Sequence, residues 1–247
     1  MLLKLTQFLL LLSVLTFSLT VNANPEKANA KLAQPGLNQP KLIQLEYDLS
    51  RNGKVFAKVK ESFSQNGKQY RIKSVTKGLG AYALMGERVS TSTGAVSKAG
   101  LKPNRFELRQ GKSAKKTLIA EFNWAKNTLV MQVKGETRTE SLAQGTQDLA
   151  SYVYQFMYKP PTQDEVIVVL TTGKRLNQYQ YKVIARGEKV DAANNSFKTL
   201  HISNQASAGD EKKQLWLAED QFYLPVRYAL EEDNDKFEQI LTKIHVE

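Results

Sequence analysis

Short segments in which apolar and polar residues alternate run from about residue 41 to the C-terminus, with turn-forming dipeptides between them. In Ile43–Leu49 every second residue is apolar, and Asn52-Gly53 and Asn66-Gly67 then mark two tight turns. Alternation with a period of two is typical of strands that bury one face. Turn signals that recur about every 8–12 residues are typical of sandwiches and barrels. The sequence therefore predicts one mostly β domain over residues 41–247, a long curved antiparallel sheet of about a dozen strands that closes, or half closes, into a barrel.

One segment has the period of an α-helix instead. Within Thr146–Tyr158, five apolar residues fall at i, i+3, i+4, i+7 and i+8, which places them on one face of a helix. Thr146 is a candidate N-cap, Asp148 suits the positive end of the helix dipole, and Pro160 follows as a stop signal. The apolar five are Leu149, Tyr152, Val153, Phe156 and Met157. We expect this single amphipathic helix, over about 146–158, to cover the inner face of the sheet or to close the mouth of the barrel.

The stretch Gly78–Gly86 interrupts the strand pattern with three glycines around four large apolar residues. One interpretation is a mobile apolar flap beside a ligand cavity, because glycines permit hinge conformations and methionine adapts to irregular shapes. The other interpretation, which we favour, is a bent strand or half-turn tucked into the core.

Aromatic residues gather in the predicted helix and near the C-terminus. Large aromatic side chains in an open barrel supply most of the contact area for an acyl chain or a glycan. The same residues would equally form an ordinary dry core, which is the commoner arrangement. The candidate ligand-binding residues are Tyr82, Leu84, Met85, Tyr152, Phe156 and Trp216.

The N-terminus has the organisation of a secretory signal peptide. Lys4 precedes a leucine-rich segment without charge, and Val21-Asn22-Ala23 offers a cleavage site after Ala23. Residues 1–23 are therefore predicted to be a signal peptide and residues 24–40, with three of the seven prolines, a flexible linker. The protein is expected to be exported to the periplasm. The alternative is an uncleaved N-terminal membrane anchor, because Leu5–Val21 is only slightly shorter than the ~20 residues that span a bilayer.

The composition narrows the possible partners. The formal charge is +11, and removal of Lys4 with the signal peptide leaves +10, which favours anionic partners such as lipid headgroups. The predicted export argues against nucleic acid. The chain has no cysteine, which excludes disulfides, thiolate chemistry and lipid attachment through cysteine. After the signal peptide the longest apolar run is Val166–Leu170, so we expect no later membrane-spanning helix.

No catalytic or metal-binding motif stands out in the sequence. His201 and His245 are the only histidines, and neither belongs to an H-E-x-x-H pattern. Glu231–Asp235 resembles a calcium loop in charge alone, because it lacks the glycine and the terminal glutamate of an EF-hand. An enzyme would have to use paired carboxylates about 5–9.5 Å apart, with Asp148 and Asp220 as the best candidates. At a helix N-terminus, Asp148 is expected to favour its ionised form. We predict no catalytic residue, metal or cofactor.

Four stretches, in this order and spacing, carry a likeness to a known family. They are G-L-K-P-N-R-F at Gly100–Phe106, Q-G-T-Q-D-L-A-S at Gln144–Ser151, A-R-G-E-K-V at Ala185–Val190 and L-W-L-A-E-D-Q-F-Y-L-P-V-R at Leu215–Arg227. Together they resemble the exported bacterial proteins of domain-of-unknown-function family 3108, from about Leu45 to the C-terminus. That resemblance implies an exported β-rich domain and no established activity. The last stretch is also similar to the closing strands of LolA-like periplasmic lipoprotein carriers, open barrels that hold acyl chains under a helical lid.

These observations predict a non-enzymatic periplasmic module that binds a lipid or another amphipathic envelope component. The alternative is a structural or protein-interaction domain in envelope biogenesis, whose barrel is solid and whose exposed edge strand docks a partner protein. An interior cavity above ~300 Å³ favours the first hypothesis. A carboxylate-based hydrolase of envelope glycan or lipid is the third and least favoured hypothesis.

Overall fold

The computed structural model describes residues 39–111, 117–204, 211–232 and 235–247. The predicted signal peptide and residues 24–38 of the predicted linker lie outside the described residues. At the end of that linker, the side-chain amide of Gln39 donates to the carbonyl of Met157 at 2.9 Å, and Pro40 is buried. Gln39 and Pro40 therefore both contact the folded domain.

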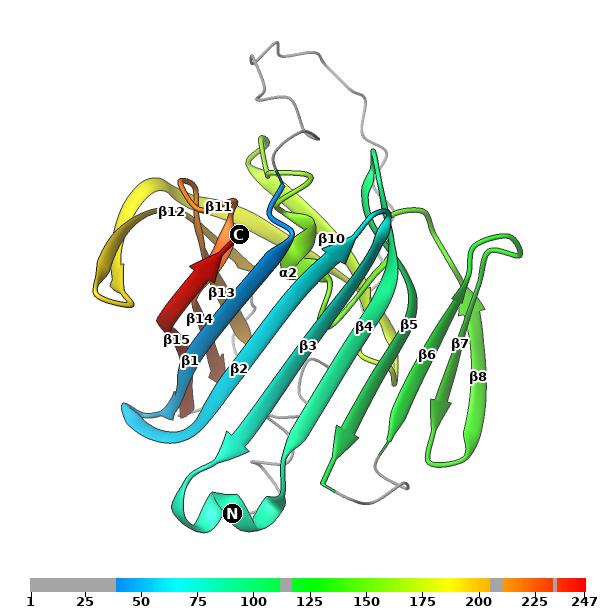
Figure 1. The fold of residues 1–247 in the computed structure, drawn as a ribbon, viewed down its shortest axis with the longest axis horizontal. Helices are drawn as coiled ribbons and strands as arrows, with labels where there is room; N and C mark the ends of the chain where they lie inside the picture. Colours follow the sequence, from blue (N-terminus) through cyan, green and yellow to red (C-terminus); the bar gives the residue numbers. More distant parts are fainter. Residues whose placement is uncertain (1–38, 112–116, 205–210, 233–234) are drawn as a thin grey trace.

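In the described part of the chain, fifteen strands form one sheet (Figure 1). In chain order they are β1 (Leu42–Arg51), β2 (Lys54–Asn66), β3 (Gln69–Gly78), β4 (Arg88–Ser97), β5 (Gly100–Gln110), β6 (Leu118–Asn123), β7 (Thr128–Val133), β8 (Glu136–Ser141), β9 (Gln147–Asp148), β10 (Glu165–Thr171), β11 (Leu176–Ala192), β12 (Asn195–Asn204), β13 (Lys212–Ala218), β14 (Leu224–Glu232) and β15 (Asp235–Val246). Their order in the sheet is β8-β7-β6-β5-β4-β3-β2-β1-β15-β14-β13-β12-β11-β10-β9. All neighbours pair antiparallel except β9 and β10, which are parallel.

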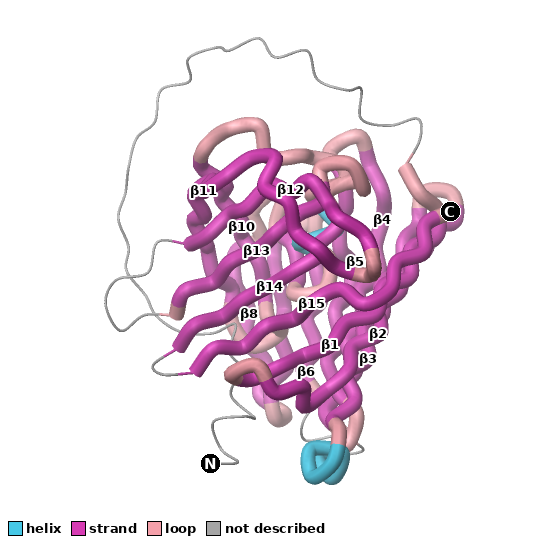
Figure 2. Tube along the Cα trace, turned by 90° about the vertical axis from the view of Figure 1, so that its left-hand side faces the viewer, coloured by secondary structure: helices cyan, strands magenta, loops and turns pink. Residues whose placement is uncertain are grey.

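The first and last strands lie side by side in the middle of the sheet. β1 pairs with β15 from Ile43, opposite Val246, to Arg51, opposite Phe237. Strands β2–β8 continue as a meander on one side of this pair, and β14 back to β10 form a second meander on the other. The sheet curls around a common interior (Figures 1 and 2). The prediction of a single, mostly β domain with a long curved sheet is confirmed.

The curled sheet does not close, because its two ends come together without pairing strand to strand. The Oγ1 of Thr171 on β10 donates to the Sδ of Met131 on β7 at 3.2 Å, and the side chain of Gln147 on β9 donates to the carbonyl of Leu101 on β5 at 3.0 Å. Beyond this seam, β8 forms one edge of the sheet, and all six of its residues are exposed. The sequence did not indicate β8 or β9, because one lacks apolar residues and the other has only two residues.

The first two hairpin turns show how local chemistry sets the register. Asn52 and Gly53 have φ of 49° and 78°, so both adopt the left-handed conformation that a type I′ turn requires. The second turn lies one residue later than predicted: Asn66 pairs with Gln69 at the ends of β2 and β3, and the loop consists of residues 67 and 68.

The predicted helix over 146–158 is much shorter in the structure. Only α2 (Tyr152–Gln155) is α-helical, and turns extend it on both sides. Thr146 is not its N-cap, since Asp148 still pairs as a strand and Ser151 precedes the first helical residue. The side chain of Asp148 instead accepts two backbone N–H groups in the turn that leads into the helix. Gln147 and Asp148, which the prediction placed in the first turn of the helix, instead pair in parallel with β10.

The segment around α2 lies inside the curled sheet, where the sequence placed it, and contacts both halves of the sheet (Figure 1). Tyr152 and Phe156 pack with residues of β10–β13. Tyr154 and Met157 belong to the main core, which includes residues of β1–β7, β14 and β15. The segment is therefore buried on both sides and is not amphipathic.

The stretch after β3 forms a 3-10 helix, η1 (Gly80–Met85), in which no residue is buried. Leu84 is 91% exposed, whereas Tyr82 and Met85 pack in part against the core. The expected bent strand or half-turn tucked into the core is therefore wrong: η1 protrudes at one end of the sheet (Figure 1). No helix in the described part of the chain is long and apolar enough to cross a membrane.

Candidate functional site

A cavity of about 150 Å³ lies inside the curled sheet. Its walls come from β2, β3 and β4 on one side and from β13, β14, β15 and the α2 segment on the other. Polar groups make up much of its lining, which distinguishes it from the apolar core around it. They are Glu61, Ser74, Thr76, Arg88, Ser90, Tyr152, Tyr228 and Gln239.

The strand period explains why these polar side chains point inward. Tyr70 and Ile72 of β3 are buried, so Ser74 and Thr76, which follow at intervals of two residues, project from the same face. The inner positions of β3 thus change from apolar to polar along the strand. The next strand, β4, is in register, with Ser90 opposite Ser74 and Arg88 opposite Thr76.

Glu61 of β2 is the acidic member of the cavity. Its carboxylate accepts hydrogen bonds from Ser74 Oγ at 3.0 Å and from the phenol of Tyr154 at 3.2 Å. Burial raises its pKa above the ordinary glutamate value, and the two hydrogen bonds oppose that effect. Glu61 is therefore held by neutral donors and not by a cation.

Among the described residues that line the cavity, Arg88 is the only cation. Within the described residues, no hydrogen bond or ion pair is found for its guanidinium group. Part of the side chain remains accessible where it lines the cavity, while the surrounding protein removes bulk water from the charge. That burial lowers the pKa of Arg88 to about 10, which still leaves it charged at neutral pH.

Asp148 lies in a fully buried polar cluster between β4 and α2. One carboxylate oxygen accepts the backbone N–H groups of Ala150 and Ser151, both at 2.9 Å, and the other accepts the hydroxyl of Ser92. Burial raises the pKa of Asp148 to about 6 despite these hydrogen bonds. The expectation that the ionised form of this carboxyl group is favoured is therefore not met, because loss of water outweighs the hydrogen bonds.

Four tyrosines gather on the β11–β14 side of the interior: Tyr152, Tyr179, Tyr181 and Tyr228. Burial raises the pKa of each of these phenols, so they are neutral donors at physiological pH. The hydroxyl of Tyr181 is buried and has no hydrogen-bond partner within the described residues. Tyr152 and Tyr228 extend to the cavity lining.

The structure does not bring the six candidate ligand-binding residues together. Tyr152 lines the cavity, and Phe156 packs in the neighbouring apolar cluster. Tyr82 and Met85 border a separate void of about 10 Å³ that also touches Arg88, whereas Leu84 points into solvent.

Trp216, the sixth candidate, points away from the cavity, since its neighbour Leu215 lines the cavity and successive strand residues alternate. Its ring stacks on His201 at 4.1 Å between centroids, and the guanidinium of Arg227 lies 4.5 Å from its ring centroid. Its indole N–H donates to Glu188 at 3.3 Å. Trp216 therefore holds together polar side chains of neighbouring strands.

The residues considered for catalysis also lie apart. Asp148 is fully buried, whereas Asp220 is exposed in the turn between β13 and β14, so the two do not share an opening. His201 contacts Glu188 at 3.2 Å, and His245 contacts Glu247 at 2.6 Å. Among the described residues, no group of three histidine, aspartate or glutamate side chains is arranged to hold a metal ion.

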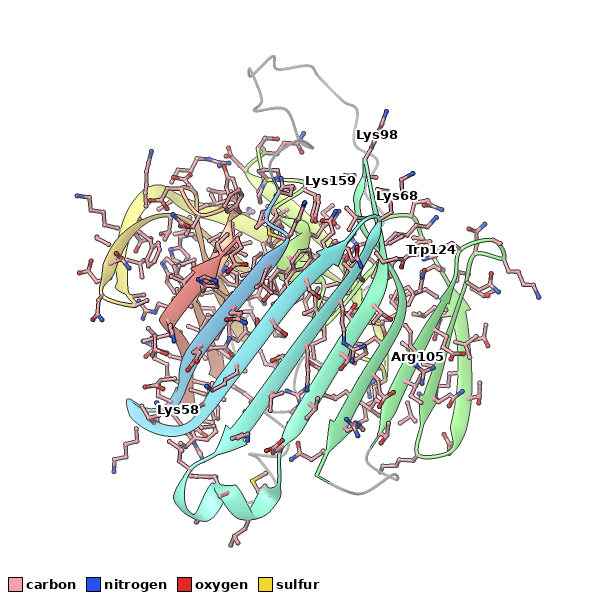
Figure 3. All side chains as sticks on the ribbon, viewed as in Figure 1. Lys58, Lys68, Lys98, Arg105, Trp124 and Lys159 are labelled. Carbon is pink, nitrogen blue, oxygen red and sulfur yellow. The ribbon has the colours of Figure 1, made fainter. Side chains whose placement is uncertain are left out.

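A second feature lies on the surface, at the end of the sheet opposite η1. Lys68, Lys98 and Lys159 are exposed there (Figure 3), and we call them the lysine rim. The backbone N–H of Val96 donates to the carbonyl of Lys68, which places the β2–β3 turn beside the β4–β5 turn that carries Lys98. The side chain of Gln155 donates to Ala99, which joins the α2 segment to the same turn.

The rim lysines differ in pairing from three lysines of β2 and β3. Lys58, Lys60 and Lys77 each lie within 3.0 Å of a carboxylate. In the part of the chain that the structure describes, none of the three rim lysines has an ion pair. A larger depression, of about 630 Å³, lies where the β11–β12 turn (Asp191–Ser196) meets Ile240–Thr242 of β15, but it is open and has one charged lining residue.

Sequence reasoning missed both features. Ser74, Arg88 and Ser90 lie in segments of alternating sequence, but which of their faces points inward depends on which positions are buried. That signal was present: extending the phase of Tyr70 and Ile72 places Ser74 on the inner face. The lysine rim had no signal in the sequence, because its members lie on three turns that only the folded sheet brings together.

The fold and these sites define a class of protein: a barrel-like β domain, made from one curled and unclosed sheet, with a small polar cavity inside. The chain belongs to the family described as Protein of unknown function (DUF3108), whose model matches residues 45–242. The resemblance inferred from the sequence is thereby confirmed over nearly the same range.

Solved structures show a likeness of fold. A beta-barrel-like protein of domain of unknown function DUF1849 from Brucella abortus matches with a TM-score of 0.55 at 10% identity, over 85% of this chain and 99% of that one. A protein with a YmcC-like fold from Bacteroides fragilis NCTC 9343 covers 87% of this chain and 100% of its own at 10% identity, with a TM-score of 0.33. The comparison with curated proteins gave no match.

Proposed function

We propose that the protein is an exported, non-enzymatic module of the periplasm that binds an anionic envelope lipid through its lysine rim. The observation that carries this proposal is the set of three exposed ammonium groups, on three separate segments, without a carboxylate partner in the described residues. Basic clusters of this kind are attracted to anionic lipid surfaces. The side-chain amide of Gln39 donates to the carbonyl of Met157, two residues before Lys159, so Gln39 also lies at this end.

The interior cavity argues against the carriage of an acyl chain. Its volume of about 150 Å³ is below the ~300 Å³ at which ligand pockets begin, and much of its lining is polar. An acyl chain would have to displace the buried aromatic side chains of the α2 segment, such as Tyr154. We therefore do not extend the LolA-like expectation of a chain-filled barrel to this protein.

Vesicle flotation tests the proposal. Protein purified from the periplasm should float with phosphatidylcholine vesicles that contain phosphatidylglycerol and should stay behind with phosphatidylcholine alone. Replacement of all three rim lysines by glutamate should weaken binding at least about tenfold, because three attractions become repulsions. Intact mass of the same protein should place its N-terminus at Asn24 if the signal peptide is cleaved as predicted.

A matched control keeps the net charge of the rim variant. Lys54, Lys73 and Lys189 are also exposed and without ion pairs in the described residues, but they lie on β2, β3 and β11. Their replacement by glutamate should leave much more of the binding intact. Equal losses in the two triple variants would show that only total charge matters, and the lysine rim would not be the site.

The edge strand β8 supports a second candidate function, a structural or protein-interaction domain. β8 pairs on one side only, and its exposed residues leave its free edge open for strand addition. A photo-crosslinking residue at Thr139 in living cells should then give one defined adduct with an envelope protein. The same residue at Lys73, on the outer face of β3, should not give it.

A further inference from the structure

The charge of Arg88 is the feature of the interior that the proposed function leaves unexplained. A cation removed from bulk water is costly unless a counter-ion or hydrogen bonds compensate it. In the described residues, the guanidinium has neither, although carboxylates compensate other arginines of the sheet, such as Arg51 with Asp235 at 2.5 Å. The nearest carboxylate in the cavity lining is that of Glu61, and its hydrogen bonds go to Ser74 and Tyr154 instead.

The groups around Arg88 are hydrogen-bond donors that also lack partners. Thr76 lies directly opposite Arg88 on β3, and Ser90 follows two residues later on the same face of β4. No hydrogen bond of the Thr76 or Ser90 hydroxyl is found in the described part of the chain. Tyr228 adds a neutral phenol to the lining of the same cavity. The cavity thus combines one uncompensated cation with several free hydroxyl groups.

We propose that the cavity at Arg88 is a binding site for a phosphate group, held by the guanidinium together with the hydroxyls of Thr76 and Ser90. A planar guanidinium can donate two parallel hydrogen bonds to phosphate oxygens. The remaining oxygens accept from hydroxyl donors, and inorganic phosphate or a phosphate monoester has more terminal oxygens than a carboxylate. The volume of about 150 Å³ accepts a group of this size but not a bulky ligand.

Two sources can supply the group, free inorganic phosphate or the phosphate of a lipid headgroup, and soluble probes separate them. We would titrate the exported protein by calorimetry with inorganic phosphate, with glycerol 1-phosphate and with short-chain phosphatidylglycerol. Tighter binding of inorganic phosphate would identify a free anion as the ligand, and tighter binding of either glycerol-linked probe would identify a lipid headgroup. Absence of heat and of thermal stabilisation with all three probes would overturn the proposal.

Variants of Arg88 decide whether the binding occurs in the cavity. Arg88→Gln should weaken binding of the best probe at least about tenfold, and Arg88→Lys should bind with intermediate affinity, because it keeps the charge but loses the two-pronged donor. Arg71→Gln is the control, since Arg71 is an exposed cation on β3 and has no ion pair in the described residues. Equal binding by the Arg88→Gln and Arg71→Gln variants would show that the anion sits elsewhere.

A second readout does not need the ligand. If Arg88 serves to bind phosphate and not to stabilise the fold, its replacement should not destabilise the protein. In the absence of phosphate, the Arg88→Gln variant should unfold at a temperature at least as high as the wild type, because the substitution removes an uncompensated cation. A clear fall in that temperature would give Arg88 a structural role and count against the site. Vesicle flotation through the lysine rim should be retained in Arg88→Gln, so failure of this inference is distinguishable from failure of the proposed function.

Discussion

The carboxyl group of Asp148 couples the stability of the fold to pH. Burial raises its pKa to about 6 in the folded protein, against 3.8 for an ordinary aspartate. Between these values the folded protein holds a proton that the unfolded chain has lost. The free energy of unfolding should therefore fall as the pH rises from about 4 to about 6 and level off above, with a total change of about 3 kcal/mol at most.

Asp148→Asn tests this assignment, because an amide cannot titrate and can still accept from the backbone of Ala150 and Ser151. We expect a smaller fall in the free energy of unfolding between pH 4 and pH 6.5 than in the wild type, measured by urea denaturation. Glu61, whose pKa is also raised by burial, contributes in the same direction, so the comparison rests on the difference between the two proteins. Identical pH profiles would contradict a titrating role for Asp148.

At the residue scale, the sequence predicted which side chains are apolar and buried better than which polar groups are buried. Tyr152 and Phe156 are buried as expected. The environment of Asp148 was not predictable, because Ser92, which donates to it, lies 56 residues away in the chain. The inward direction of Arg88 could be inferred only by knowing which residues of β4 are buried. Ser92 is buried, and Arg88 lies four residues before it, so both side chains point to the same face.

The α2 segment is the element whose packing joins the two halves of the sheet. Phe156 is 5% exposed and packs with residues of β10–β13, so Phe156→Ala should lower the free energy of unfolding by about 3–5 kcal/mol. Phe222, which is 37% exposed in the turn before β14, is the matched control. Because its side chain is only partly buried, Phe222→Ala removes less apolar contact and should cost well below that amount. A loss below about 1 kcal/mol for Phe156→Ala would show that α2 is peripheral.

At the element scale, the sequence predicted most strands and misjudged the segments that lie between the two meanders. The helical period of residues 149–157 was real, but Tyr154 on its other side is also buried, because a second layer of sheet covers it. Gln155, which lies off the predicted apolar face, accepts the N–H of Leu101 at 2.7 Å and donates to Ala99 at 3.0 Å. Such partners lie far along the chain and have no local signal.

The arrangement of the whole molecule follows from the pairing of its two terminal strands. With β1 beside β15, each meander grows outward from the centre, and the sheet can curl until β10 meets the inner side of β5–β7. Local alternation predicted the strands and their faces but not this order, since any antiparallel meander has the same period. The lysine rim and the cavity both depend on this order, which explains why neither was predicted.

Native-state hydrogen exchange should reveal this architecture as a gradient across the sheet. β8 pairs only with β7 and is exposed along its whole length, so its amides should exchange through local opening at a small free-energy cost. β1 is hydrogen-bonded on both sides and carries buried residues such as Ile43 and Leu45, so its amides should exchange only on global unfolding.

Hydrogen exchange in β15 is the comparison for β8, because each is the last strand of a series that pairs in chain order. β15 lies in the middle of the sheet and should be as slow as β1, even though it contains the last residues of the chain. If β8 were as protected as β15 in the isolated protein, something would have to cover its free edge, such as a second copy of the chain. Protection of β8 that appears only at high protein concentration would identify that copy as the cover, because association depends on concentration and local opening does not.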